Sequence, residues 1–155
     1  MNWFECKVSY EKITESGSPK KVNEPYLVDA LSFTEAEARI IEEMNPFISG
    51  EFTVTDIKRA KIAEIFPNEK GDRYYRCKVV FVTLDEKSGN EKKFSQIVLA
   101  QAFSIDNALE VLYAGMKGTL SDYVVSSVSE TAIVDIFPFS SDRIPDGDSG
   151  QSAED

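Results

Sequence analysis

The sequence contains no histidine, which is the side chain most often used as a general base near neutral pH and the commonest metal ligand. Ser–His and Cys–His nucleophiles are therefore excluded within one chain. No GxxxxGKS, GxxxxGKT or GxGxxG motif occurs, so no phosphate-cradling loop is indicated. Carboxylates are plentiful but scattered, and four of them share the polar side of one predicted helix (Glu35, Glu37, Glu42 and Glu43). We expect a protein that is not an enzyme and has no catalytic residue, metal or cofactor. An enzyme with a magnesium-type site of Asp and Glu carboxylates is a weaker alternative.

The sequence also lacks a long apolar run, since none approaches the roughly 18 residues of a membrane-spanning helix. Its start, Met1-Asn2-Trp3-Phe4-Glu5-Cys6, has neither the basic nor the apolar region of a signal peptide. Cysteine is scarce, and Cys6 and Cys77 are expected to be free thiols in a reducing compartment. These absences predict a cytoplasmic protein that contacts no membrane.

Positive charge is scarce as well, because 17 Lys and Arg stand against 27 Asp and Glu, a net charge of −10. Residues 140–155 carry −4 of this charge, show no periodicity and are rich in Ser, Gly and Asp, which predicts a disordered acidic tail. The remaining −6 disfavours loose attraction of the body to polyanions, although it leaves room for a local basic patch.

What the sequence does contain is an internal repeat of about 70 residues. The segment at 3–10 aligns with 74–81 at an offset of 71 residues, and 62–67 aligns with 133–138 at the same offset. We assign the repeats to residues 1–68 and 72–139. Because 70 residues alone bury a marginal core, we expect the two repeats to share one core in one compact domain.

Each repeat opens with an alternating apolar and polar segment, which is typical of a strand. Ser-Gly loops at 15–20 and 87–91 lead into second strands at about 22–31 and 94–103. An amphipathic helix follows, for which Thr34 with Glu37, and Asp106 in the second repeat, are the predicted N-caps. The predicted buried stripes are Ala36, Ile40, Ile41 and Met44, and then Ala108, Leu112, Tyr113 and Met116.

Long β-prone stretches close the repeats at about 51–66 and 122–137. They exceed the usual strand length, so each either bends or splits, near Lys58-Arg59 and near Ser129-Glu130. The fold class is therefore α+β, with two tandem ββαβ units, or ββαββ if split, around a pseudo-two-fold axis. Two helices cover antiparallel sheets in this arrangement. Cys6 and Cys77 occupy equivalent places on the apolar side of a strand, where cysteine behaves as a small hydrophobe.

The opposite sides of the first strands carry aromatic groups beside cations. Trp3 and Lys7 lie there in the first repeat, and Tyr74, Arg76 and Lys78 in the second. Bases stack on rings at about 1–3 kcal/mol each while Lys and Arg track phosphates, so the pattern is typical of single-stranded nucleic-acid binding. The structural alternative is that the rings pack against the other half and the cations are merely solvated.

Two further groups of cations extend this candidate site. Lys92 and Lys93 follow the second Ser-Gly loop, and the closing stretch of the first repeat adds Lys58, Arg59 and Lys61. The second repeat has Ser129, Glu130 and Ala132 in place of this last group, which indicates that the halves divide a task. The predicted nucleic-acid site is Trp3, Lys7, Lys58, Arg59, Lys61, Tyr74, Arg76, Lys78, Lys92 and Lys93.

The repeat, the Trp3-Phe4-x-Cys6-Lys7-Val8 opening and the segment Ser32-Phe33-Thr34-Glu35-Ala36 together show a family likeness. Over nearly all of residues 1–138 the chain resembles a bacterial and phage family known only as a domain of unknown function. The resemblance implies a prokaryotic cytoplasmic setting, on phage or mobile elements, and no assigned residues. At the level of fold, the tandem units are similar to the PUR-repeat and Whirly single-strand binders, whose units place four strands before a helix.

The main alternative to nucleic-acid binding is a protein-interaction module. Its acidic surface or tail would mimic nucleic acid or occupy a basic partner surface. The tail resembles the acidic C-termini with which single-stranded DNA-binding proteins recruit partners, although it lacks their terminal aromatic residue. An exposed sheet edge also allows pairing with a second copy, as a homodimer.

Overall fold

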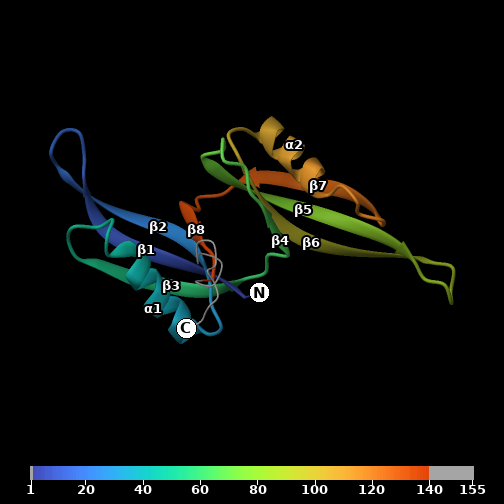
Figure 1. Ribbon diagram of the computed structural model, residues 1–155, viewed down its shortest axis with the longest axis horizontal. Coiled ribbons are helices and arrows are strands. Elements are labelled where there is room, and N and C mark those ends of the chain that lie inside the picture. The colour runs from blue at the N-terminus through green and yellow to red at the C-terminus, as the bar shows by residue number, and fades with distance from the viewer. Residues whose placement is uncertain (1, 140–155) are drawn as a thin grey trace, which may run out of the picture. The chain divides into compact units, whose positions relative to one another are not determined.

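The computed structural model describes residues 2–139, so the predicted tail at 140–155 lies outside the described residues. These residues form eight strands and two helices (Figure 1). In chain order the elements are β1 (Trp3–Ile13), β2 (Pro19–Asp29), α1 (Phe33–Met44), β3 (Phe52–Ala60), β4 (Glu64–Phe66), β5 (Arg73–Leu84), β6 (Glu91–Ala102), α2 (Ile105–Gly115), β7 (Asp122–Glu130) and β8 (Asp135–Phe137). The α+β class and the repeated ββαβ unit are confirmed, and each closing stretch is split into a long and a short strand.

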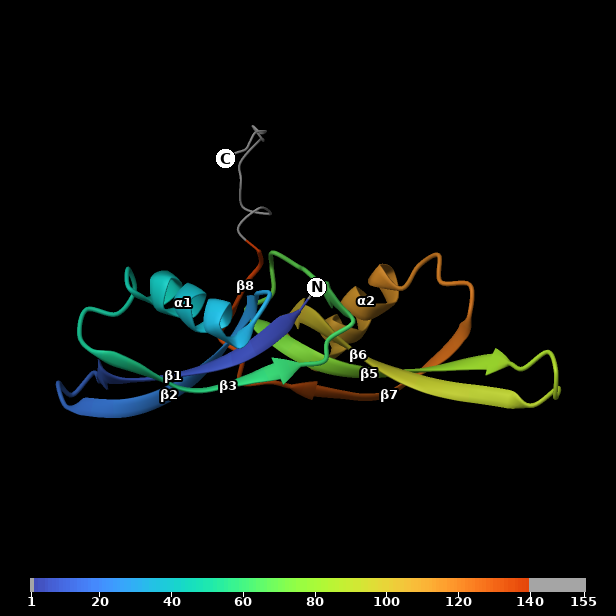
Figure 2. The same cartoon turned by 90° about the horizontal axis from the view of Figure 1, so that it is seen from below.

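Unit 1 is a four-stranded sheet, sheet A, with α1 on one face (Figure 2). The strand order is β3-β1-β2-β8. Alternation along β1 buries Phe4, Cys6 and Val8 against Ala36 and Ile40 of α1, and all five side chains are fully buried. The period of two in the strand and of 3.6 in the helix therefore meet in one apolar layer.

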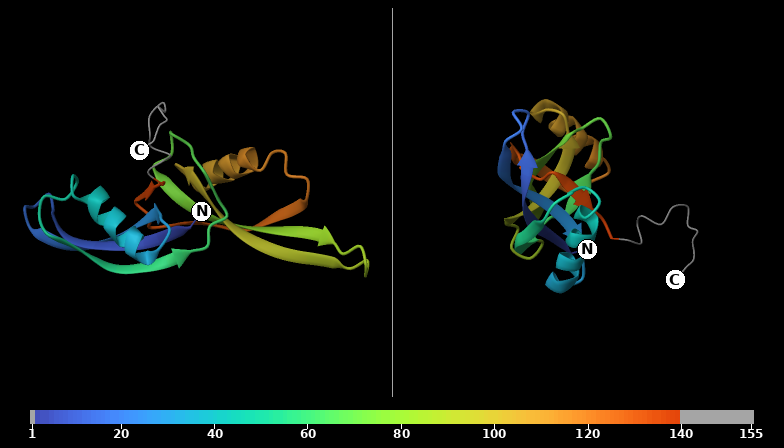
Figure 3. Two further views of the ribbon diagram at one scale, coloured as in Figure 1. Left: turned by 60° about the horizontal axis from the view of Figure 1, so that its bottom comes forward. Right: turned by 90° about the vertical axis from the view of Figure 1, so that its left-hand side faces the viewer.

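Unit 2 repeats this arrangement as sheet B, with the strand order β4-β6-β5-β7 and α2 on one face (Figure 3). Tyr75, Cys77 and Val79 of β5 pack against Ala108 and Leu112 of α2. The buried residues of the two units form two separate clusters of matching composition. Whether the units also share a core with each other stays a prediction.

The short strands are exchanged between the two repeats. β4 follows β3 in the chain but pairs in parallel with β6 of unit 2, from Glu64 opposite Val98 to Phe66 opposite Ala100. β8 follows β7 but pairs in parallel with β2 of unit 1. The expected antiparallel sheets are therefore mixed. Of the described residues, 2–60 and 134–139 form unit 1 and 61–133 form unit 2, so the units do not coincide with the repeats in sequence. Each unit needs a strand from the other repeat to complete its sheet.

The edge strands β3 and β7 contain the same β-bulge. Lys7 lies opposite Asp56 but Val8 lies opposite Val54, so Thr55 is the extra residue, and Ser126 is its equivalent in β7. The Thr55 hydroxyl donates to the carbonyl of Lys7 at 3.4 Å. The Ser126 hydroxyl makes the matching bond to Lys78, also at 3.4 Å. A hydroxyl residue therefore stabilises the irregular backbone of a bulge at the same place in each unit.

Both helices begin two residues earlier than predicted. Ser32 is the N-cap of α1, and its side chain accepts from the backbone N–H of Glu35 at 3.1 Å. Ser104 caps α2 in the same way from Asn107 at 3.0 Å. The predicted caps, Thr34 with Glu37 and Asp106, are wrong because they lie inside the first turn, where serine two residues before already satisfies an orphan N–H.

The predicted apolar stripes need one correction each. Ala36, Ile40 and Met44 are buried as expected, but Ile41 is 40% exposed and its equivalent Tyr113 is 50% exposed. Position 41 lies about 100° around the helix from Ile40, so it reaches the edge of the buried face and not its centre. Neither helix of residues 2–139 has the length and apolarity that crossing a membrane requires.

Candidate nucleic-acid interface

The face of sheet B that points away from α2 carries a row of cations. Tyr75, Cys77 and Val79 face α2, so the alternation of β5 turns Arg76 and Lys78 to the other side, where both are exposed. Lys93 lies directly opposite Val82, which belongs to the same alternate set, so it shares that face. At about 3.4 Å per residue, the row from Arg76 to the level of Lys93 is roughly 20 Å long.

Lys61 adds a fourth cation to this row. It lines a hollow of about 380 Å³ together with Ser95 and Ile97 of β6. Ile97 is the direct partner of Lys78 in the sheet. We call the exposed group Lys61, Arg76, Lys78 and Lys93 the cationic face of sheet B.

No ion pair within residues 2–139 involves a member of the cationic face. The residues opposite the two strand cations on β7 are neutral, since Arg76 faces Ser129 and Lys78 faces Ser127. By contrast Lys92, which was also predicted for the site, pairs with Asp85 at 3.7 Å at the end of the hairpin. The charge of the cationic face is therefore available to a ligand, and that of Lys92 is partly compensated.

The same positions of sheet A are electrically balanced. Glu5 occupies the place of Arg76, and Lys58 lies opposite it on β3. Lys7 occupies the place of Lys78, and Asp56 lies opposite it. Because opposite charges directly across two strands attract each other, Lys7 and Lys58 are matched by carboxylates in their own sheet. The basic cluster on β3 thus compensates an acidic neighbour.

The cluster Lys58, Arg59 and Lys61 does not form one surface. Neighbouring residues of a strand point to opposite faces, so Arg59 lies on the side of α1. There its guanidinium lies 5.2 Å from the centroid of the Phe4 ring and 5.9 Å from that of Phe33. This cation–π contact stabilises the start of α1. Lys58 lies on the opposite face of sheet A, and Lys61 belongs to unit 2.

The two predicted stacking residues are placed differently from expectation. Tyr74 is buried at 9% exposure, so its ring presents little surface to a base. Trp3 is half-buried at the start of β1, in unit 1. The uncharged side chains beside Arg76 and Lys78 on the exposed face include Val80 and Val124, which are aliphatic. Phosphate contacts, and not ring stacking, are the interaction that this face can supply.

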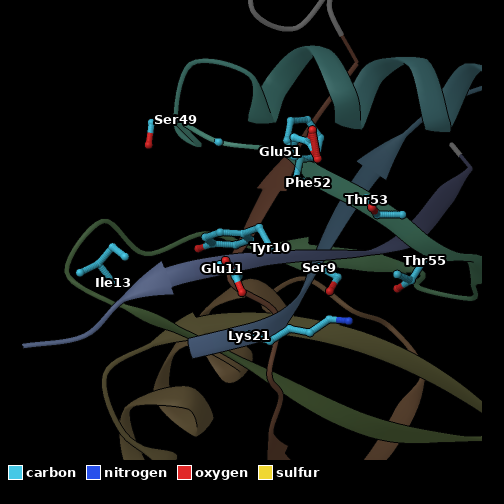
Figure 4. Close-up of a pocket in the computed structure, with 11 residues that line it drawn as sticks. Ser9, Tyr10, Glu11, Ile13, Lys21, Ser49, Glu51, Phe52, Thr53 and Thr55 are labelled. Atoms are coloured by element: carbon cyan, nitrogen blue, oxygen red, sulfur yellow. The ribbon is translucent and has the colours of Figure 1, made fainter. Parts of the chain in front are cut away.

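A larger hollow than the one beside Lys61 lies elsewhere, at the β1 and β3 end of sheet A. This cavity of about 730 Å³ is lined by Tyr10, Glu11 and Phe52, with Lys21 reaching in from β2 (Figure 4). Hydroxyl groups of Ser9, Ser49, Thr53 and Thr55 also line it. None of the ten residues of the predicted site lines this cavity.

Neither cysteine has the properties of a reactive functional-site thiol. Both are buried free thiols under the helices. Burial, with smaller effects from Glu5 and Asp56, raises the pKa of Cys6 to about 12. Burial alone raises the pKa of Cys77 to about 11. Such thiols stay protonated near neutral pH and are poor nucleophiles. Among residues 2–139 there is also no group of three His, Cys, Asp or Glu side chains that could hold a metal ion.

These features define a tandem-repeat α+β protein with one unbalanced cationic sheet face. The chain belongs to the family DUF4494, a domain of unknown function, whose model matches residues 2–139. No curated protein and no solved structure matches the chain.

The sequence predicted the cations of sheet B as site residues, but it did not show that their charges are less balanced than those at the equivalent positions of sheet A. The signal was present in the aligned repeats, where Glu5 in the first repeat corresponds to Arg76 in the second. The cross-strand partners Asp56 and Ser127 were not accessible without the register of the sheets.

Proposed function

We propose that the chain is a non-enzymatic protein that binds single-stranded DNA or RNA along the cationic face of sheet B. One observation carries the proposal: within residues 2–139 none of the exposed cations Arg76, Lys78, Lys93 and Lys61 forms an ion pair, in a chain whose net charge is −10. Keeping four uncompensated cations together has an electrostatic cost that an anionic ligand removes. We also propose that the protein acts in the cytoplasm of prokaryotic cells and is encoded on phage or mobile elements.

A single strand suits this face better than a duplex does. The cations form a row over neighbouring strands, with Arg76 and Lys78 on β5, Lys93 on β6 and Lys61 just before β4. The side chains of β7 beside Arg76 and Lys78, those of Ser127, Ser129 and Val124, are uncharged. A flexible strand can follow such a row, whereas the acidic rest of the protein would repel the second strand of a duplex. We assign at most secondary roles to the other predicted cations, because carboxylates or an aromatic ring within the protein already interact with them. These cations are Lys7, Lys58, Arg59 and Lys92.

The test is fluorescence anisotropy of labelled oligothymidine and oligouridine at low and at high salt. With four phosphate contacts, the logarithm of the binding constant should fall against that of salt with a slope of about −3. The double variant R76E/K78E should weaken binding by about tenfold or more and flatten the slope by about 1.5.

The matched control lies at the equivalent places of sheet A. The double variant K7E/K58E changes charge by the same amount and should leave binding within about threefold. Absence of binding by micromolar protein at low salt would refute the proposal. So would equal losses in the two double variants, because general electrostatics would then explain the binding.

A further inference from the structure

The long edge strand of sheet B has a bulge but little other protection. β7 ends the order β4-β6-β5-β7, and its segment from Tyr123 to Ser129 contains no charged residue. Val124 within it is 58% exposed. Edge strands usually carry charges or proline, because a free row of backbone N–H and C=O groups pairs readily with another strand. β7 has neither in these seven residues.

An apolar flank of α2 extends along the same edge. Ile105, Leu109 and Tyr113 follow each other at intervals of four, and Ile105 and Tyr113 are 53% and 50% exposed. Gly115 lies against the Phe66 ring, so that side of α2 faces β4. Leu109 and Tyr113 lie on the other side of the helix, by its period of 3.6 residues, and β7 is the edge opposite β4. An added strand beyond β7 would pass beneath this flank.

Unit 1 closes the corresponding edge. β3 carries Asp56, Lys58 and Arg59, and Arg59 covers the Phe33 ring at the position equivalent to Ile105. Glu37 stands where α2 has Leu109. Unit 1 therefore protects this edge and flank with charged side chains, and unit 2 lacks these charges although it shares the bulge.

We propose that β7 and the Ile105–Leu109–Tyr113 flank bind an extended segment of another protein, which joins sheet B as a fifth strand. The segment carries apolar residues at alternate positions, for the flank, and Lys or Arg at its ends. Basic ends follow from charge, because Asp122 and Glu130 bracket β7, and the exposed ion pair of Glu130 with Arg73 at 3.7 Å compensates the second carboxylate only in part. A second copy fits less well, since antiparallel pairing of β7 about Ser126 places Asp122 opposite Glu130 twice. Strand addition of this kind is a general mode of peptide recognition.

This site is separate from the proposed nucleic-acid site. The flank belongs to α2 and therefore lies on the helix side of sheet B, whereas the cations occupy the other face. Substitutions on the flank accordingly leave the oligonucleotide measurement unchanged, and the two proposals fail independently.

The test selects peptides from a random nonapeptide display library with the full chain. Enriched peptides should show alternating apolar residues between basic ends. Their synthetic versions should lose about tenfold or more in affinity with L109E, which installs the residue of unit 1, and with Tyr113→Ala, which removes a half-exposed ring. The matched control Ile41→Ala in α1 should leave affinity unchanged.

Any of three results would overturn the proposal. The first is a selection without the alternating and basic pattern, and the second is binding that both flank variants leave intact. The third is a concentration-dependent dimer in sedimentation velocity that L109E abolishes, which would make a second copy the occupant. Tyr113→Ala keeps the test decisive where L109E lowers stability, because that ring is half exposed.

Discussion

Units 1 and 2 have the same strands, bulges, caps and buried cysteines, yet their charges differ at three equivalent places. On the sheet face, Glu5 and Asp56 of unit 1 correspond to Arg76 and Ser127 of unit 2. On the edge strand, Asp56 and Lys58 of β3 are replaced by serine in β7. On the helix flank, a glutamate is replaced by leucine. What the units share is required by folding, so the differences mark the surfaces where ligands are expected.

A fourth difference lies inside the fold, where α1 is fixed to the returning chain. Arg39, 8% exposed, donates to the carbonyl of Pro138 at 2.7 Å and to that of Asp29, and pairs with Glu43 at 3.7 Å. Its equivalent in α2 is Val111, which packs against the core of unit 2. Unit 1 therefore holds its exchanged strand partly by hydrogen bonds, and unit 2 holds its own by apolar contact.

The largest effect on stability that we predict comes from removing Arg39. Arg39→Ala removes two charge-assisted hydrogen bonds, worth roughly 1.5–3 kcal/mol each, so the free energy of unfolding should fall by about 3–5 kcal/mol. Val111→Ala, the matched control, should cost about 1 kcal/mol, because it only deletes two partly buried methyl groups. Urea unfolding measures both values. Equal losses would show that Arg39 does not anchor the segment at Pro138.

The exchange of short strands gives the next prediction. Phe137, from the second repeat, stacks on Tyr26 of unit 1 at 5.8 Å between ring centroids. Phe66, from the first repeat, packs into the core of unit 2. Each change to alanine should cost about 2–4 kcal/mol, because the rings are only partly buried. Amide hydrogen exchange should show faster opening of β1 and β2 for Phe137→Ala, and of β5 and β6 for Phe66→Ala. The reverse pattern would contradict the exchange.

Local patterns in the sequence predicted the strands, the helices and their order, because alternation and helical periodicity reflect contacts a few residues apart. Ser32 as N-cap was also accessible, since Glu35 lies three residues after it, but the same spacing of Thr34 and Glu37 competed with it. The exchange of β4 and β8 was not accessible. It depends on which sheet a three-residue strand joins. The local sequences around Ile65 and Ile136 are alike in the two repeats, so they do not indicate which sheet each strand completes.

Part of the candidate site was predictable, because strand alternation is a local pattern of the sequence. Exposed Arg76 and Lys78 follow from alternation along one strand. The burial of Tyr74 and the cation–π role of Arg59 depend on tertiary neighbours, which single-strand patterns do not contain. Charge balance depends on register, and one residue of slippage would have exchanged every partner.

The smallest effect concerns a hydrogen-bonded group present in unit 1 alone. Tyr10 and Tyr26 both donate to the Glu24 carboxylate, at 2.8 and 2.9 Å. Unit 2 has Phe81, Gln96 and Val98 at the equivalent places. Burial, and then the bond to Glu24, raises the pKa of Tyr10 to about 12. Because the folded pKa lies above the unfolded value of about 10, the contribution of Tyr10 is complete below pH 10. It is lost as pH rises from 10 to 12.

Tyr10→Phe, which installs the residue of unit 2, should therefore lower the free energy of unfolding by about 1 kcal/mol below pH 10. Between pH 10 and 12 the difference from the parent protein should shrink towards zero. The measurement compares the free energies of unfolding of the two proteins at each pH. Cys6 and Cys77, whose pKa values are raised to about 12 and about 11, titrate over the same range in both proteins, so their effect cancels in this difference. Urea unfolding at pH 8, 10 and 11.5 measures it. A difference that stays constant over this range would mean that the Tyr10 hydroxyl contributes through packing and not through its bond to Glu24.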